Sequence, residues 1–322
     1  IERRRATGAH MNLSQIFRTE ATSAAQTHRA SSRIAMPPSS LPLPSVQVRH
    51  YPIPHRLTPY LETAEARNLI NAVGLRWHLV PTNCVGFGLL VGDPASDFEL
   101  DGSGFESVIK GLLPRALGTW CSAPSVSIGV TMTPRALMCL PIEATDFGFG
   151  LWAHSREVFS RDLFTRLYSR VRDAPTLDAK VEALLGWLEH VLCDSNPAHG
   201  RQLAIGEAAT QMRRFDAPSL ADAARRVGVS PRQLERDFQR YLGATPRRYA
   251  QVAKVQQMAQ LVWQGNSPAD TAAALGFADQ AHMTRVVHDV TGMRPATLLQ
   301  RARDSPFARA TGTPRMLRLT HV

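Results

Sequence analysis

Two short segments near the C-terminus carry side chains that can hydrogen-bond to the edges of nucleic-acid bases. The candidates are Arg232, Gln233 and Arg236 in "PRQLERDFQR", and Gln280, His282 and Arg285 in "QAHMTRVVHD". Arg pairs with guanine O6 and N7, and Gln pairs with adenine N6 and N7. Either side chain can instead contact phosphate, which positions a protein without reading sequence. For Arg236 we favour a phosphate or structural role, because it recurs as Arg285. For His282 we favour a position as a polar neighbour of the DNA groove, rather than a role as a metal ligand.

The two segments belong to a repeated pattern. Residues 220–246 and 268–295 share Ala, Asp, Ala and Gly at an offset of 48 residues, then Arg, Gly and Pro at an offset of 49. Chance similarity is a poor explanation for so many matches. The change of offset falls between the turn and the second helix, so the two copies differ slightly where that helix begins.

Each copy has the spacing of a helix-turn-helix. In the first copy, Ala224 permits close crossing of the helices, Gly228 permits a left-handed turn and Leu234 fills the core. Ser230 can cap the second helix, with Pro231 in its first turn. The sequence therefore predicts two hairpins in an all-α region, each with a recognition helix.

A connecting helix is predicted from Pro246 to a stop at Gly265. Its roughly 18 residues would span about 27 Å, and successive major grooves on one face of DNA lie about 34–36 Å apart. Two recognition helices on this spacer could therefore enter adjacent grooves. Arg247 and Arg248 in its first turn are candidate contacts to the DNA backbone, with a solvated basic face as the alternative.

The charge is concentrated in this C-terminal part. The 322-residue chain has a formal net charge of +10, and residues 201–322 hold 18 Lys and Arg against nine Asp and Glu. Residues 51–200 hold 12 against 16. A polyanion is therefore the expected partner of the C-terminal third alone.

Residues 51–200 are predicted to form an α+β domain. "NCVGFGLLVGD" and "PSVSIGVTMTP" are β-branched, Gly-bounded runs typical of strands, and residues 156–193 have the apolar spacing of two helices. The apolar stripes of these helices either form internal core or meet a second copy of the chain. The domain is expected to serve regulation or dimerisation.

No catalytic residue, metal site or cofactor is predicted. The four cysteines, Cys84, Cys121, Cys139 and Cys193, lack the spacing of a zinc site or a disulfide framework and are expected to be mostly buried thiols in a reducing cytosol. Acidic residues at 93–101 do not match a calcium loop, and Ser155 beside His154 gives no defensible nucleophile–base pair.

The ends of the chain are predicted to be tails. Residues 1–45 form a basic, Pro-containing segment expected to be disordered, and residues 304–322 a flexible C-terminal tail. The first tail also has the composition of an organellar transit peptide, and Met11 could be the true start. No apolar run is long enough to span a bilayer, so a cytoplasmic location is expected.

Residues 203–303 resemble the DNA-binding domain of the AraC/XylS family of bacterial transcription regulators. "GATPRRY" and "GFADQAHMTRVVHDVTGMRP" carry the resemblance, and residues 51–195 look like N-terminal domains found in some members. The resemblance implies double-stranded DNA as partner. It adds RNA polymerase, a second copy of the chain in a homodimer and a small-molecule effector as further candidates.

The second copy departs from the family pattern. Met283 and Val287 stand where phenylalanines are usual, Leu298 replaces an aromatic residue, and His288–Asp289 replaces a basic pair. Smaller core residues predict a looser second hairpin, and the lost charge predicts a weaker phosphate grip.

Three function classes are therefore weighed. A sequence-specific, non-enzymatic DNA-binding transcriptional regulator is favoured. A DNA-repair or alkylation-response protein is disfavoured by the absence of clustered cysteines. A non-specific architectural DNA binder is the third class.

Overall fold

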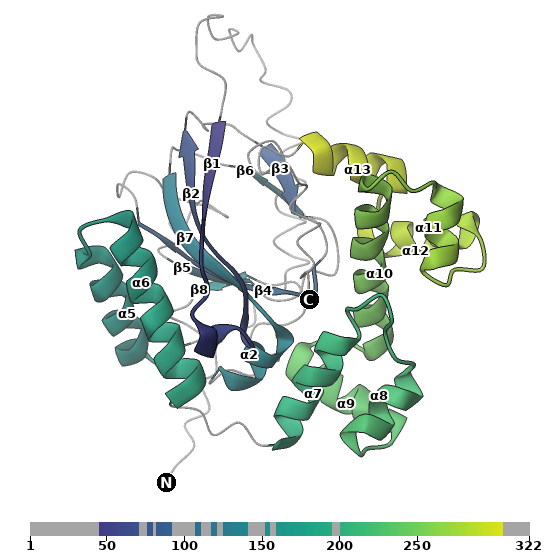
Figure 1. Ribbon diagram of the computed structural model, residues 1–322, viewed down its shortest axis with the longest axis horizontal. Helices are drawn as coiled ribbons and strands as arrows, with labels where there is room; N and C mark the ends of the chain where they lie inside the picture. The colour runs from purple at the N-terminus through teal and green to yellow at the C-terminus, as the bar shows by residue number, and fades with distance from the viewer. Residues whose placement is uncertain are drawn as a thin grey trace, which may run out of the picture. The chain divides into compact units, whose positions relative to one another are not determined.

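The computed structural model describes residues 45–70, 76–79, 82–91, 107–110, 117–120, 125–140, 152–154, 159–194 and 200–304. The described residues belong to one compact unit, whose N-terminal domain contains the sheet and whose C-terminal region is helical (Figure 1). This arrangement confirms the predicted α+β domain followed by an all-α region.

An antiparallel sheet organises the N-terminal domain. Its six strands run in the order β1-β2-β7-β4-β5-β8, with bounds Ser45–Tyr51, Leu61–Ile70, Ser125–Met132, Val85–Leu90, Ser107–Lys110 and Trp152–His154. A separate ribbon pairs β3 (Arg76–Leu79) with β6 (Leu117–Trp120). Val85, Phe87 and Leu89 are buried at alternate positions of β4, as expected when one face of a strand meets the core. The two quoted strand predictions are confirmed by β4 and β7.

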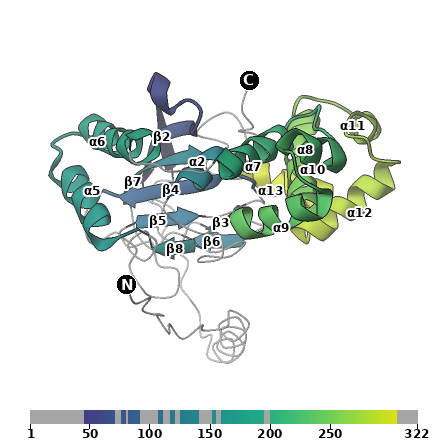
Figure 2. The same cartoon turned by 90° about the horizontal axis from the view of Figure 1, so that it is seen from below.

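Two helices pack together beside this sheet (Figure 2). α5 (Arg161–Asp173) and α6 (Leu177–Glu189) begin at the caps Ser160 and Thr176, and a π-helical turn continues α6 to Asp194. The ring of Trp187 lies 5.7 Å from that of Phe87 in β4, which anchors α6 to the sheet. Their predicted apolar stripes are buried in the core, at Leu167, Val171, Val181, Leu184, Leu185, Leu188 and Leu192.

Two further short elements belong to this domain. A 3-10 turn spans His55–Leu57, and helix α2 (Pro134–Cys139) follows β7 directly. The Thr133 side chain caps α2 by accepting a hydrogen bond from the N–H of Ala136.

Seven helices of the described residues form the C-terminal region. They are α7 (Gly200–Gln211), α8 (Leu220–Val227), α9 (Pro231–Leu242), α10 (Pro246–Trp263), α11 (Pro268–Ala274), α12 (Gln280–Thr291) and α13 (Pro295–Asp304). Figure 1 shows α8 and α9, the first hairpin, at one end of α10, and α11 and α12, the second hairpin, along its other half. The predicted connecting helix is confirmed: α10 has 18 residues, and Gly265 beyond its end has φ +95°.

The two hairpins belong to different hydrophobic cores. The buried residues of the first hairpin, including Leu234 and Phe238, join one continuous cluster with the sheet and α6. The second hairpin forms its own cluster with the distal part of α10 and with α13. Met283, Val287 and Leu298, the departures in the second copy, lie in that separate cluster. The first hairpin thus shares its core with the N-terminal domain, whereas the second hairpin has a core of its own.

Some predictions lie outside the described residues. Of the predicted tails, 1–45 and 304–322, the structure describes only Ser45 and Asp304. The acidic segment 93–101, Cys121 and Ser155 also lie outside the described residues.

Candidate nucleic-acid interface

Local sequence fixes the shape of the first hairpin. The Ser219 side chain caps α8, and Gly228 ends that helix with φ +75°, a conformation that L-residues with a side chain rarely adopt. Ser230 then caps α9 by accepting a hydrogen bond from the N–H of Gln233, with Pro231 at the first helical position. Ala224 and Leu234 are buried where the helices cross. The predicted turn, cap and core contacts are therefore present.

The outward face of α9 carries three charged side chains. Arg232, Glu235 and Arg236 are exposed, whereas Leu234, Asp237 and Phe238 are buried. Residues three and four apart share one face of a helix, which places Arg232 beside both Glu235 and Arg236. Glu235 was missed from sequence, because an acidic residue is unexpected near phosphates. A carboxylate can nevertheless accept a hydrogen bond from cytosine N4.

Gln233 is less exposed than Arg232, Glu235 and Arg236. Its Nε2 atom donates a hydrogen bond to Asp237 Oδ1 at 3.0 Å within α9. Asp237 Oδ2 accepts from Arg201 of α7, at 2.7 Å from Nη2 and 3.1 Å from Nε. The side chain of Gln233 is therefore held in place before any DNA is present.

The second hairpin begins its recognition helix differently. Asp279 caps α12, one residue farther from the turn glycine Gly276 than Ser230 is from Gly228. Gln280 and Arg285 are exposed as expected. His282 is half-buried: its Nδ1 accepts a 3.4 Å hydrogen bond from the N–H of Ala278, and its ring lies 5.4 Å from that of Phe277. Its ring thus supports the turn.

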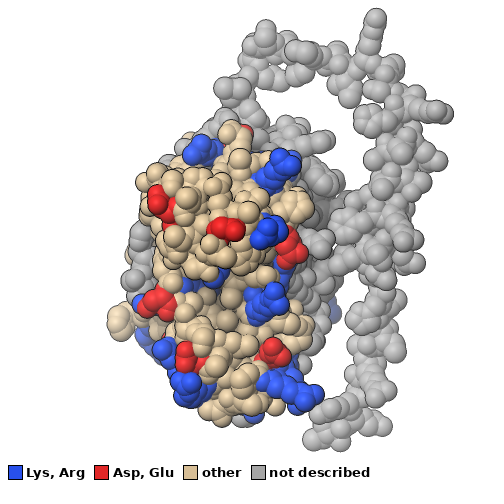
Figure 3. Space-filling view, turned by 90° about the vertical axis from the view of Figure 1, so that its right-hand side faces the viewer, with Lys and Arg blue, Asp and Glu red and all other residues tan. Residues whose placement is uncertain are grey.

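The two arginines that begin α10 have different surroundings. Arg247 is exposed, whereas Arg248 donates a 2.9 Å hydrogen bond to Asp289 Oδ2 on α12. This ion pair joins the connecting helix to the second recognition helix. It also explains an acidic residue at position 289, where the family pattern has a basic one. Figure 3 shows Lys and Arg side chains spread over the helical face, with Asp and Glu between them.

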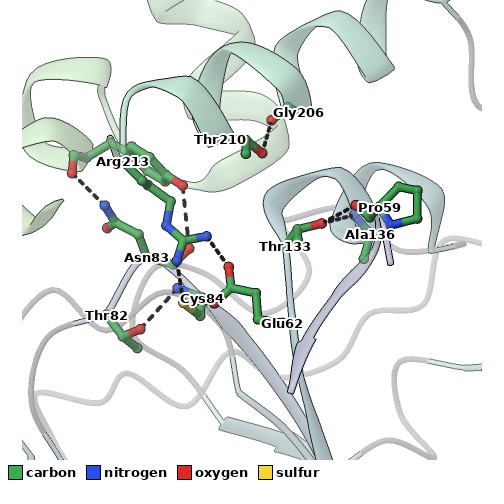
Figure 4. Close-up of polar contacts among 11 residues, drawn as sticks. Pro59, Glu62, Thr82, Asn83, Cys84, Thr133, Ala136, Gly206, Thr210 and Arg213 are labelled. Carbon is green, nitrogen blue, oxygen red and sulfur yellow. Dashed lines mark hydrogen bonds and ion pairs between the residues drawn. The ribbon is translucent and has the colours of Figure 1, made fainter. Parts of the chain in front are cut away.

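A buried polar cluster links the segment between α7 and α8 to the sheet (Figure 4). Arg213, just after α7, forms an ion pair with Glu62 of β2, and the two side chains are only 4% and 2% exposed. Arg213 Nη2 also donates to Cys84 Sγ at 3.0 Å, while the Cys84 thiol donates to Glu62 Oε2 at 3.2 Å. Burial raises the pKa of this thiol to about 12, so it stays protonated and unreactive.

Backbone contacts extend this link to the connecting helix. Asn83 Nδ2 donates to the carbonyl of Tyr249 at 2.8 Å, and Gln257 Nε2 donates to the carbonyl of Arg213 at 2.9 Å. On the adjacent surface, α7 approaches α2 closely: a Cβ on Gly206 would lie 2.9 Å from Met138 Cγ and 3.0 Å from Arg135 Cα. The elements on either side of the first hairpin, α7 and α10, are therefore held by polar and steric contacts together.

Other chemistry is not assembled in the part of the chain that the structure describes. Cys84, Cys139 and Cys193 form no disulfide with one another. No group of three or more His, Cys, Asp or Glu among the described residues is arranged to hold a metal ion. No described helix is long and apolar enough to cross a membrane.

Comparisons with known proteins agree with this geometry. Residues 223–301 match a family model described as a helix-turn-helix domain. An uncharacterized HTH-type transcriptional regulator of Bacillus subtilis (strain 168), YbfI, is 37% identical over 65 residues, which cover 20% of this chain and 24% of the relative. The match thus spans about a quarter of that relative's length.

Two solved structures are similar to parts of the chain. An AraC-type transcriptional regulator from Chromobacterium violaceum is 32% identical, covers 33% of this chain and 98% of its own, and has a TM-score of 0.30. ToxT from Vibrio cholerae is 11% identical over 80% of this chain and 98% of its own, with a TM-score of 0.39.

The paired hairpins and the helix-turn-helix match define a DNA-binding transcriptional regulator. The chain belongs to the AraC/XylS family of such regulators.

Proposed function

We propose that the protein regulates transcription by placing α9 and α12 in two successive major grooves of one promoter site. One observation carries the proposal: two capped helices with exposed polar side chains flank the 18-residue α10. A helix of that length spans about 27 Å. Because the hairpins extend beyond its ends, α9 and α12 can enter major grooves that lie about 34–36 Å apart.

The exposed residues are assigned roles by their surroundings. In the first groove, Arg232, Glu235 and Gln233 read bases, and Arg236 contacts base or phosphate. In the second groove, Gln280 and Arg285 take these roles, and Arg247 contacts the DNA backbone. Arg248 and His282 were also candidates for DNA contact. We assign them to holding the second hairpin, because each already has a partner within the protein.

The N-terminal domain is proposed to regulate by holding the first hairpin. The support is the buried cluster of Glu62, Cys84 and Arg213, together with the shared hydrophobic core. A small-molecule effector, RNA polymerase or a second copy of the chain would act through this contact. The apolar stripes of α5 and α6 are buried in the core, so a homodimer must use other surfaces.

Binding selection with the intact protein tests the main proposal. A pool of randomised duplexes should yield one extended motif, and affinity should fall steeply with salt because phosphate contacts release counterions. Enrichment of no motif, with salt-dependent binding, would identify an architectural binder instead. Light scattering on the same sample gives the mass and so tests the homodimer.

A role in DNA repair has less support. Such a role would need an accepting or metal-bound cysteine, and the burial of Cys84 keeps its thiol protonated. The proposal therefore includes no catalysed reaction and places the action in the cytoplasm, at the chromosome. Incubation with alkylated duplex DNA should leave both the DNA and the protein mass unchanged.

A further inference from the structure

Three side chains form a continuous chain of contacts behind the first recognition helix. Arg201, near the start of α7, binds one oxygen of Asp237, and the other oxygen of Asp237 accepts from Gln233. The side chain of Asp237 is 8% exposed, whereas that of Arg201 is 49% exposed. A buried carboxylate needs a charged partner, and Arg201 supplies it.

The carboxylate determines which way the amide of Gln233 faces. Ionised Asp is only an acceptor, so Gln233 must turn its NH₂ group toward Asp237. One N–H of that group and the carbonyl Oε1 then remain for another partner. Adenine presents an acceptor at N7 and a donor at N6 in the major groove, which is the matching pair. The backbone N–H of Gln233 is also fixed, because it donates a hydrogen bond to Ser230 Oγ, the N-cap of α9.

We propose that Arg201 is a positioning residue for specificity, which acts through Asp237 to orient Gln233 toward an adenine. This inference rests on the proposed function, since it requires α9 to lie in the major groove. The second hairpin lacks the arrangement: at the offset of 49 residues, Val286 stands in place of Asp237 and His282 in place of Gln233. The first recognition helix therefore has a base-reading side chain, Gln233, whose orientation is fixed before DNA binds, and the second helix does not.

A simpler role for Arg201 gives a different result. As a half-exposed cation, Arg201 could contact a phosphate, and its loss would then weaken all sequences alike and lower the salt slope by about one. Loss of a positioning residue instead changes preference at one base position and leaves preferences elsewhere unchanged. A purely structural role would lower thermal stability with no change of preference.

The test is a binding selection on randomised duplexes with the full chain and matched variants. Gln233→Ala first identifies the base position that Gln233 reads. Arg201→Gln should reduce the preference for adenine there by about fivefold or more, the lower range for one bidentate contact. Arg201→Lys, which keeps a charge beside Asp237, should retain more of it. Arg172→Gln on α5 removes an exposed, ion-paired arginine and is the control for charge.

A double variant completes the test. Arg201→Gln should have no further effect on base preference in the Gln233→Ala background, because both act through one contact. Additive effects, or an unchanged adenine preference in a folded Arg201→Gln protein, would overturn the role of Arg201. If the unmodified protein selects no motif at all, the proposed function itself fails, and the two failures are thereby distinguished.

Discussion

Arg213, just after α7, and Glu62, in β2, form an ion pair across 151 residues of sequence, with both side chains buried. Their contact joins the DNA-binding region to the sheet. Because a buried charge without its partner is costly, both residues are expected to be sensitive to change.

Replacing Glu62 by Gln should lower the free energy of unfolding by about 3 kcal/mol, because Arg213 is left buried without its counter-ion. Urea denaturation of the full chain measures this loss. Replacing both residues, with Glu62→Gln and Arg213→Met together, should recover part of it. A loss below about 1 kcal/mol would show that the pair is solvated, as exposed pairs are.

Gly206→Ala should destabilise the protein, although Ala normally favours a helix. The new methyl group would meet Met138 and the backbone of Arg135 and would push α7 away from α2. Gly186→Ala in α6 is the matched control: its Cβ meets nothing within 4 Å, so it should stabilise by about 0.5–1 kcal/mol. The melting temperature should fall for Gly206→Ala and rise for Gly186→Ala. A rise for both variants would contradict the close packing of α7 against α2.

Cys84 should report whether the segment that carries Arg213 leaves the sheet. In the native protein its thiol should resist iodoacetamide at pH 8, since its pKa is about 12 and it is buried. The half-buried Cys193 should react sooner. Glu62→Gln should speed labelling of Cys84, as followed by mass spectrometry of the digested protein. Rapid labelling of Cys84 in the unmodified protein would contradict the packed arrangement.

The hairpins could be predicted from sequence because their determinants are local. Ser230, Pro231 and Gly228 set a cap, a first turn and a left-handed turn within a few residues, and all three are placed as predicted. Strands β4 and β7 and the connecting helix were predictable for the same reason, from periodicity and Gly stops.

Contacts between distant segments could not be predicted in this way. Arg213 stands in a basic stretch and looks like any surface arginine, yet Glu62 and the sheet bury it. The orientation of Gln233 depends on Arg201, which contacts Asp237 from 36 residues away. The core that the first hairpin shares with the sheet also joins segments far apart in sequence, so no local pattern announces it.

Removing the N-terminal domain should therefore affect the two hairpins unequally. In a fragment of residues 200–304, amide hydrogen exchange should show faster exchange in α8 and α9 than in the intact chain. α11 and α12 have a separate core and should change little. If α8 and α9 exchanged as slowly in the fragment as in the intact chain, the dependence of the first hairpin on the sheet would be refuted.

Arg247→Ala should weaken binding to all duplexes alike and lower the salt slope by about one, as expected for a phosphate contact. Arg248→Ala should instead loosen α12, because Arg248 pairs with Asp289. Its effect should fall on the base preferences of the second half-site. Titrations of both variants at several salt concentrations separate these outcomes, and identical behaviour would contradict the distinction.

Hydroxyl-radical footprinting of the intact protein on a selected site tests the two-groove account most directly. We expect two protected segments separated by about one helical turn, 10–10.5 base pairs. Arg285→Ala should weaken only the segment bound by α12, and Arg232→Ala only the one bound by α9. A single protected segment, or loss of both segments together in either variant, would contradict the account.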